Sequence, residues 1–339
     1  MSHLILTILF TVFFAVIGWA ESSPTISITG SVRQPLNLTL EDLQALQAVT
    51  VRLNEVTMDE EYNGVFYFRG VPLRTLLDLA AIQKKEETAF PKPVDLAILV
   101  RNKEGKQVIL SWGEIFYRNP SEVVLALSGK PLIPHHDCNK CHGPEIYQER
   151  LDVLSRPVGY PKLVVANDFY TDRSLENVTS IEVFDLRLKM KRKKMERLFA
   201  PGFTIIGDIT KEVSISRLSS YQRVEILAKM VGDGAGYHGI KSYGGVLLSE
   251  LLIKAGVQPN ATQGFIFAAP DGYRALLSSG EVFLSSHGKS ILIADQIADE
   301  PIEESGRFKL LLADDLAADR WVKAINNIVI VTFKQKPSS

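Results

Sequence analysis

Both cysteines of the chain and three of its six histidines lie within the short stretch "IPHHDCNKCHGPE", which runs from Ile133 to Glu145. Cys138, Cys141 and His142 have the spacing C-x-x-C-H, the attachment signature of haem c. Two thiols at this spacing reach two vinyl groups on one porphyrin edge, and the adjacent imidazole turns under the ring to the iron. The motif therefore predicts one covalently bound haem with His142 as an iron ligand.

Two other kinds of site fit the same residues. Zinc could be bound by His135 or His136 with both cysteines and one further group, although the adjacent Cys141 and His142 diverge too strongly to bind one tetrahedral ion together. A redox disulfide is the third interpretation, because Cys-x-x-Cys pairs can cycle between oxidised and reduced forms. The stretch "PLIPHHD" before Cys138 is a proline-bounded loop, whereas a thioredoxin-like pair follows a strand that runs into a helix. Haem is the first expectation, and zinc and a disulfide stay open.

Other potential ligands are scattered along the chain. Met190 and Met195 are candidates for a sixth iron ligand, which the sequence does not fix. His238 and His287 are expected to be loop residues that face water.

The N-terminal segment has the pattern of a targeting signal. Residues 1–20 are apolar almost without interruption from Leu4 to Ala20, and they end in a small-x-small pattern. This pattern predicts a secretory signal peptide that is cleaved after Ala20, and hence an exported, periplasmic or extracytoplasmic protein. The alternative is a retained membrane anchor, since about 17 to 25 apolar residues can span a bilayer. Contact with a membrane is expected only in that case.

Charge is balanced over the whole chain, with 38 basic and 39 acidic residues, so a nucleic-acid partner is not expected. The local exception is "RLKMKRKKMER" at residues 187–197, which contains seven Lys or Arg. Such a run is most simply the solvated surface of a linker. If haem is present, the same charges could steer an acidic redox partner protein.

The sequence contains an internal repeat. "YNGVFYFRGVPLRTLLDLAAI" from Tyr62 aligns without a gap to "YHGIKSYGGVLLSELLIKAGV" from Tyr237, at an offset of 175. Residues 98–116 align to residues 265–283 at an offset of 167, and both segments contain a Gly-Glu pair.

A third block repeats "PKLVVANDFYTDRSLENVTSIEVF" as "FKLLLADDLAADRWVKAINNIVIV" at an offset of 147. It places Asp168 and Arg173 over Asp315 and Arg320. The fall in offset from 167 to 147 indicates an insertion of about twenty residues in the first copy. That insertion lies within residues 133–160, and the cysteine cluster is inside it.

Periodicity indicates the same mixed class of fold in each copy. Alternation in "AILVRN", "SIEVF" and "IVIVTF" predicts short strands. Apolar spacing predicts helices in "LEDLQALQ" after Thr39 and in "VPLRTLLDLAAI" after Gly70. We therefore predict two α+β domains, at residues 26–185 and 202–333, joined by a basic linker at residues 186–200.

The order of three motifs resembles the pterin-binding domain of the sulfite oxidase family. They are "ITGSVRQPLNLTLEDLQAL", then Y-x-G followed by "GVPLRTLL", and then "LVVANDFYTDRSLENVTSIEV". The resemblance implies two tandem sulfite-oxidase-like mixed α/β domains rich in short strands. It also implies molybdenum bound by one cysteine thiolate ahead of Y-x-G.

This sequence departs from the family at that thiolate. "AVTVRLNEVTMDEEYNG" and "RVEILAKMVGDGAGYHG" contain no cysteine, and neither Asn54 nor Met58 supplies a soft thiolate ligand. Molybdopterin is therefore not expected. A pterin held without a cysteine stays an alternative, because "GDGAG" at residues 232–236 could present amides to a phosphate.

Together these patterns predict an exported electron-transfer protein with one haem c on a molybdopterin-domain-like scaffold. A zinc-binding or partner-binding scaffold without catalytic activity is the main alternative, and a pterin-dependent oxidoreductase is the second. The enzymatic status stays open, with a redox carrier favoured over a molybdenum oxidoreductase.

Overall fold

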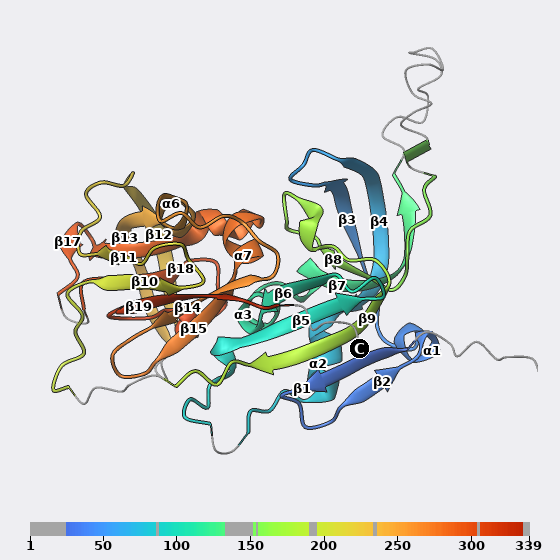
Figure 1. Cartoon of the computed structure of the whole chain (residues 1–339), viewed down its shortest axis with the longest axis horizontal. Coiled ribbons are helices and arrows are strands. Elements are labelled where there is room, and N and C mark those ends of the chain that lie inside the picture. Colours follow the sequence, from blue (N-terminus) through green and yellow to red (C-terminus); the bar gives the residue numbers. More distant parts are fainter. Residues whose placement is uncertain are drawn as a thin grey trace, which may run out of the picture.

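The computed structural model is built from four sheets of strands, and short helices lie between them (Figure 1). The structure describes residues 25–85, 88–132, 152–153, 155–189, 195–232, 236–303 and 306–334. Within these ranges the fold is α+β, as the sequence predicts. None of the helices in these ranges is long and apolar enough to cross a membrane.

The first half of the chain, residues 25–189, forms two of the sheets. Its strands are β1 (Ile26–Gly30), β2 (Leu36–Leu38), β3 (Val49–Val56), β4 (Tyr62–Pro72), β5 (Leu96–Asn102), β6 (Gln107–Ser111), β7 (Val123–Pro131), β8 (Lys162–Val165) and β9 (Val178–Asp185). Its helices are α1 (Leu40–Gln44), α2 (Leu73–Ala80) and α3 (Trp112–Phe116), with 3-10 turns η1 (Pro93–Asp95), η2 (Pro120–Glu122) and η3 (Thr171–Arg173). One sheet has the order β2-β1-β9-β5-β6 and the other β3-β4-β7-β8. Strands β1 and β9 are parallel, with Ile28 beside Ile181.

The second half, residues 195–334, forms the other two sheets. Its strands are β10 (Phe203–Gly207), β11 (Val213–Ile215), β12 (Val224–Val231), β13 (Tyr237–Leu247), β14 (Gln263–Ala268), β15 (Arg274–Ser278), β16 (Ile291–Ile297), β17 (Glu300–Pro301), β18 (Lys309–Leu312) and β19 (Asn327–Thr332). Its helices are α6 (Leu248–Lys254) and α7 (Ser279–Phe283), with 3-10 turns η4 (Ser286–Ser290) and η5 (Ala318–Arg320). One sheet has the order β11-β10-β19-β14-β15; the other has the order β12-β13-β16-β17, with β18 paired to β16.

The two halves follow the same order of elements. Strands β10 and β19 are parallel, with Ile205 beside Ile328, as β1 and β9 are in the first half. A glycine shared by the aligned segments has a packing reason in both halves. A Cβ at Gly70 would lie 2.0 Å from the carbonyl oxygen of Leu125, and one at Gly245 would lie 2.3 Å from that of Ile293. Only glycine allows β4 and β13 to approach their neighbours this closely.

The helices expected after Thr39 and after Gly70 are confirmed as α1 and α2. Thr39 caps α1, because its hydroxyl accepts from the amide of Asp42 at 3.2 Å while its own amide donates to the Asp42 carboxylate at 2.9 Å. This reciprocal capping box satisfies two amides that lack helical partners. In α2 the residues with helical spacing are buried, namely Leu73, Leu76, Leu77 and Ala80. The apolar spacing therefore marked the face that packs on the sheets.

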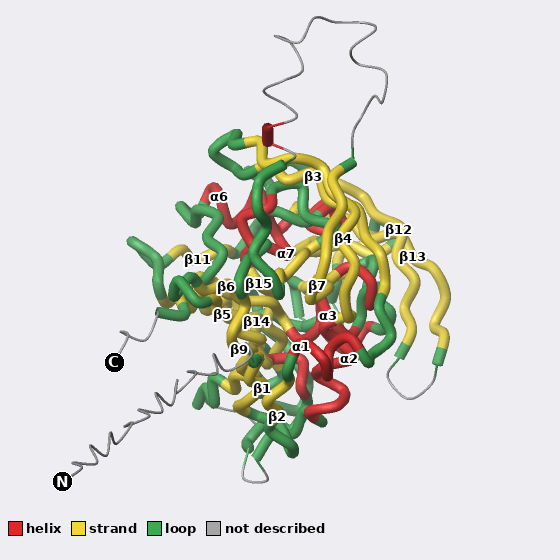
Figure 2. Tube along the Cα trace, turned by 90° about the vertical axis from the view of Figure 1, so that its right-hand side faces the viewer, coloured by secondary structure: helices red, strands yellow, loops and turns green. Residues whose placement is uncertain are grey.

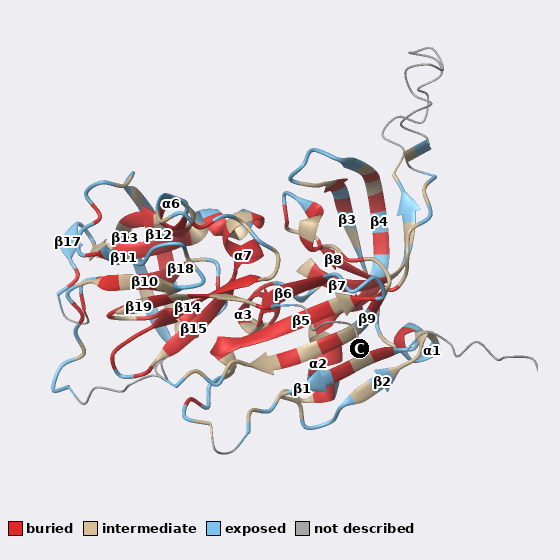
Figure 3. Ribbon diagram, in the orientation of Figure 1, coloured by how far each residue is buried: buried red, intermediate tan, exposed pale blue. Residues whose placement is uncertain are grey.

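Each half has its own apolar core, and a third cluster joins them. In Figure 1 the two halves lie side by side, and Figure 3 shows buried residues along the strands where they meet. The joining cluster takes Ala97, Leu99 and Ile109 from the first half and Ile266, Leu276 and Phe333 from the second. Figure 2 shows the sheets β5-β6 and β14-β15 close together in the same region. The halves are thus packed on one another through an apolar interface.

Several predicted segments lie outside the described residues. They include the signal segment 1–20, most of the insertion 133–160 and the centre of the basic linker 186–200. The division into two separate domains at 26–185 and 202–333 stays a prediction.

Candidate functional site

The residues of the C-x-x-C-H motif lie outside the described part of the chain. Cys138, Cys141 and His142 share this status with His135, His136 and Met190. Their place in the chain is fixed by the flanking strands, because residues 132–161 connect β7 to β8. The equivalent connection in the second half, from β16 to β18, needs only residues 298–308. Among the described residues, no group of three or more His, Cys, Asp or Glu side chains could hold a metal ion.

The donor atoms expected for molybdenum do not fit the family pattern. Asn54 lies on β3 with its side chain exposed, and Met58 is exposed in the turn that follows. Neither side chain can replace a thiolate as a soft, anionic ligand. Gly232 and Gly236 are the first and last residues of the segment "GDGAG", and the three residues between them lie outside the described ranges.

Of the two histidines expected in water-facing loops, one is exposed as expected but lies on a strand, and the other is partly buried. His238 lies on strand β13 and is exposed. His287 lies in η4, where its Nε2 is 3.0 Å from Glu122 and its Nδ1 is 3.1 Å from Asp314. Burial opposes the charged ring, but hydrogen bonds to the two carboxylates outweigh it and raise the pKa of His287 to about 9. The expectation that His287 faces water was wrong. Its partner Glu122 belongs to the first half and reaches the ring only because the two halves pack together.

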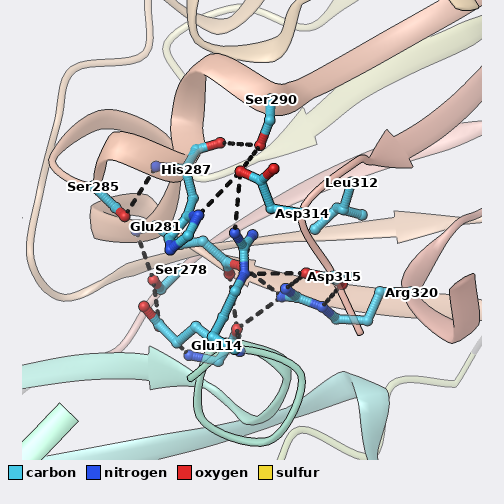
Figure 4. A network of polar contacts seen from close by, with 12 residues as sticks. Glu114, Ser278, Glu281, Ser285, His287, Ser290, Leu312, Asp314, Asp315 and Arg320 are labelled. Atoms are coloured by element: carbon cyan, nitrogen blue, oxygen red, sulfur yellow. Dashed lines mark hydrogen bonds and ion pairs between the residues drawn. The ribbon is translucent and has the colours of Figure 1, made fainter. Parts of the chain in front are cut away.

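Two fully buried arginines, Arg173 and Arg320, lie between the halves, one from each (Figure 4 shows Arg320). Each binds both carboxylate oxygens of an aspartate five residues earlier: Arg173 binds Asp168 at 2.8 Å, and Arg320 binds Asp315 at 2.7 Å. Burial opposes the charge of each guanidinium, but the aspartates outweigh it and raise the pKa of both arginines. The Asp and Arg that coincide in the repeat alignment are thus matched buried ion pairs.

Serines and glutamates cross from one half to the other around these pairs. The hydroxyl of Ser111 donates to Glu281 at 2.8 Å, and the hydroxyl of Ser278 donates to Glu114 at 2.7 Å. Each serine also accepts, at 3.1 Å, from the arginine of the other half. Each glutamate binds the arginine of its own half, at 2.8 Å for Glu114 and 2.7 Å for Glu281. The network is therefore reciprocal, and each half supplies the same four residue types.

Two glycines make room for the arginines. A Cβ at Gly113 would lie 2.2 Å from the Arg320 side chain, and one at Gly280 would lie 2.1 Å from the Arg173 side chain. This explains why the Gly-Glu pair occurs in both copies as "SWGE" and "SSGE". Sequence reasoning found these residues as a repeated pattern but could not assign their role, because the partners belong to the opposite copy.

The buried network leaves no room for a substrate. The cavity beside it has a volume of about 10 Å³ and is lined by residues that include Arg118, Arg173 and His287. That volume is at the lower limit for one water molecule, which needs about 10–15 Å³. The arrangement holds the two halves together and has no space for chemistry on a ligand.

A larger cavity, of about 280 Å³, is lined by residues of the second half and by Lys92 of the first. The residues that line it include Lys92, Met230, Tyr273, Lys309, Asp319, Trp321 and Lys323. Lys309 is the first residue of β18, and its side chain is buried, with Nζ 4.7 Å from the Trp321 ring centre and 5.2 Å from that of Tyr243. Burial, followed by the charges of Lys323 and Lys241, lowers the pKa of Lys309 to about 8. Sequence reasoning missed this lysine, whose only signal was that it aligns with Lys162.

Comparisons with known proteins add a distant similarity of fold. No protein-family model matches the chain, and no curated protein matches it. Among solved structures it is similar to the sulfane dehydrogenase SoxCD from Paracoccus pantotrophus, at 12% identity, over 92% of this chain and 78% of that chain. The TM-score of 0.33 marks only a distant similarity, so neither site residues nor activity are transferred from that enzyme. Membership of the sulfite oxidase family stays a prediction.

Proposed function

We propose that the protein is an exported electron-transfer protein that carries one haem c, attached through Cys138 and Cys141, with His142 as an iron ligand. The observation that carries this proposal is the C-x-x-C-H spacing of the chain's two cysteines. When bound, the haem supplies one-electron redox chemistry whose potential depends on the iron ligands and on solvent exposure. Export fits the proposal, because haem c is attached outside the cytoplasm.

The position of the motif supports an added function. Strands β7 and β8 are antiparallel neighbours, with Val124 paired to Val164, and they need only a short connection. The second half makes the equivalent connection with residues 298–308. Long connections that a fold does not need are common places for binding residues. Residues 133–155 therefore fit a cofactor-bearing addition to a scaffold that is complete without them.

The residues after the motif anchor this addition to the scaffold. Arg156 donates to the carbonyl oxygen of Asn63 at 3.1 Å and to Glu176 at 2.8 Å, and it also pairs with Glu55. Its guanidinium lies 5.6 Å from the ring centre of Phe66. An arginine held by several partners on β3, β4 and the segment before β9 ties the end of the addition to this part of the first half.

The test is covalent haem in the full chain, produced in a host that supplies the haem-attachment machinery. The wild-type band should show haem-dependent peroxidase staining on a denaturing gel, and Cys138→Ala with Cys141→Ala should abolish it. The matched control is His135→Ala with His136→Ala, which should keep the stain because these histidines hold no thioether. An unstained wild-type band would refute the haem proposal. Zinc found at one per chain by elemental analysis would then favour the metal-binding alternative.

The basic run at residues 187–197 fits a redox carrier as a docking surface. Seven positive charges in a chain of net charge −1 form a strong local field. We propose that this run steers an acidic redox partner.

A further inference from the structure

We propose that Lys309 is a reactive amine in the cavity of the second half, and that this cavity takes small anionic carbonyl compounds, with which Lys309 forms an imine. The proposal is independent of the haem, because the residues that line the cavity do not include the C-x-x-C-H motif.

The first support is the isolation of the Lys309 ammonium. The residue is 5% exposed, yet within the described part of the chain no carboxylate pairs with it and no hydrogen bond holds its Nζ. Its contacts are the faces of Trp321 and Tyr243, at 4.7 and 5.2 Å. Cation–π contacts stabilise an ammonium less well than a buried carboxylate does. A buried lysine that borders an open cavity without a counter-ion is available to a ligand.

The second support is the matched lysine of the first half. Lys162 begins β8 as Lys309 begins β18, and its Nζ lies 5.2 Å from the ring centre of Phe68. Unlike Lys309, it forms ion pairs with Glu55 and with Glu176, the latter at 3.0 Å. The chain thus contains the same buried lysine twice, once neutralised and once not.

The residues that replace the two glutamates explain the difference. At the repeat offsets of 175 and 147, Glu55 aligns with Met230 and Glu176 aligns with Lys323. Both replacements line the cavity beside Lys309. The apolar Met230 stands in place of one glutamate and the cationic Lys323 in place of the other. Compared with the first half, the site around Lys309 therefore has two fewer negative charges and one more positive charge. This change favours a ligand that brings its own negative charge.

The chemistry of Lys309 follows from its surroundings. Burial and the neighbouring lysines lower its pKa to about 8, so roughly a tenth of the amine is neutral at pH 7. A desolvated lysine beside other cations is an activated nucleophile. Its Nζ lone pair adds to the carbonyl carbon, and the carbonyl oxygen leaves as water with the two protons of the neutral amine. The product is a C=N bond, with no change of oxidation state.

The walls of the cavity define the class of carbonyl compound. Lys92 of the first half also lines the cavity, 5.1 Å from the Tyr273 ring centre and paired with Asp319 at 3.4 Å. Asp271 lines it as well, so three lysines face two aspartates and leave one net positive charge. Lys323 lies in the wall near Lys309. Lysine ammoniums bind phosphate or carboxylate as point charges, and the aromatic rings offer flat apolar surfaces. A volume of about 280 Å³ limits the ligand to a small molecule.

The experiment labels the full chain with pyridoxal 5′-phosphate, an aromatic aldehyde with a phosphate, and traps the imine with borohydride. Peptide mass spectrometry should find Lys309 modified at least about tenfold more than Lys162, because only a neutral, accessible amine reacts. Pyridoxal without the phosphate should label Lys309 more weakly. Equal labelling of Lys309 and Lys162, or labelling spread over exposed lysines, would overturn the proposal.

Two variants separate reactivity from loss of fold. Met230→Glu restores the carboxylate that Glu55 supplies in the first half, and it should suppress labelling while the circular dichroism spectrum stays unchanged. Lys162→Arg keeps the first-half ion pairs and should leave the labelling of Lys309 as in the wild type. A folded Met230→Glu variant that still labels at the wild-type level would show that the absence of a counter-ion does not govern the reactivity.

Discussion

At the residue scale, the halves can pack only because two glycines have no side chain. Gly113 and Gly280 face the arginine of the other half, and neither has room for a Cβ. Because the arginines are fully buried and held by carboxylates, they cannot swing out into water. The packing of the two halves and the burial of the two arginine charges therefore both depend on glycine at positions 113 and 280.

We expect Gly280→Ala to destabilise the protein by about 2 kcal/mol, since overpacking a rigid buried site typically costs about 1–3 kcal/mol. The added Cβ would lie 2.1 Å from Nε of Arg173. Chemical denaturation followed by circular dichroism measures the change. The control is Gly105→Asn in the β5-β6 turn, where a Cβ meets nothing within 4 Å and asparagine tolerates the positive φ of 80°. Equal stabilities for both variants would contradict the clash.

The second residue-scale prediction concerns pH and His287, which links Glu122 of the first half to Asp314 of the second. Its pKa is raised to about 9 in the folded state, above the usual value of about 6.5 in the unfolded chain. The protonated ring therefore adds stability that is fully present below pH 6.5 and is lost as the pH rises from 6.5 through 9. The loss should be on the order of 1 kcal/mol, because the site is partly exposed and screened.

Denaturation curves at pH 6 and pH 9.5 test this expectation. The difference in stability between the wild type and His287→Gln should shrink by on the order of 1 kcal/mol from pH 6 to pH 9.5, because glutamine does not titrate. The lowered pKa of Lys309 acts in the opposite direction over this range, but it is common to both proteins and cancels in the comparison. His238→Gln is the matched control, since His238 is exposed and its only polar contact in the described structure is to the Gly232 carbonyl oxygen. A difference between the wild type and His287→Gln that stays constant across this range would argue against the paired, protonated state of His287.

At the element scale, the sequence predicted regular elements well and contacts between halves poorly. The capping residue Thr39 and the apolar spacing after Gly70 are local signals, and each gave a helix in the right place. The matched Asp168 and Asp315 were visible in the alignment, but their pairing with buried arginines between the halves was not. Such a pairing depends on how two sheets pack, which no local pattern encodes. Lys309 was missed for the same reason, since isolation from a counter-ion is a property of the packed cavity.

A deletion tests how independent the scaffold is of the added segment. Replacing residues 133–155 with a short Gly-Ser linker should change the free energy of unfolding of the haem-free protein by less than about 1 kcal/mol, because loop length affects stability only slowly. A longer deletion, of residues 133–161, also removes Arg156 and Tyr160. It should cost about 3 kcal/mol, because these residues pack on β3 and β4 and bury Phe66 and Phe68. A cost of about 3 kcal/mol already for the shorter deletion would show that the added segment itself is part of the fold.

At the scale of the whole molecule, the two matched halves differ in one connecting segment and in the surroundings of one buried lysine. The first half has the added segment and a neutralised Lys162. The second half has the shorter connection and a Lys309 that pairs with no carboxylate among the described residues. The shared network of Arg173 and Arg320 holds the halves as one body. If the two proposals hold, one half carries electrons and the other binds a ligand on the same scaffold, because function depends on the residues added to a fold and not on the fold itself.

The basic run at residues 187–197 belongs to this scale, because steering depends on the field of the whole protein. We expect the rate of electron transfer to an acidic partner protein to fall several-fold between 0.02 and about 0.5 M salt, since the Debye length is only about 10 Å at 0.1 M. Changing Lys191, Arg192, Lys193 and Lys194 to Gln should lower the low-salt rate and flatten its dependence on salt. Stopped-flow mixing of the reduced protein with the partner measures both.

The control removes the same number of charges elsewhere, by changing the exposed lysines Lys103, Lys106, Lys211 and Lys229 to Gln. Both variants have the same net charge, so a general field would slow them equally, whereas a steering surface would slow only the first. A wild-type rate that does not change with salt would exclude steering, and the run would then serve only to keep the linker solvated. If both variants slow equally, the partner responds to the overall charge of the protein, and docking near the linker is ruled out.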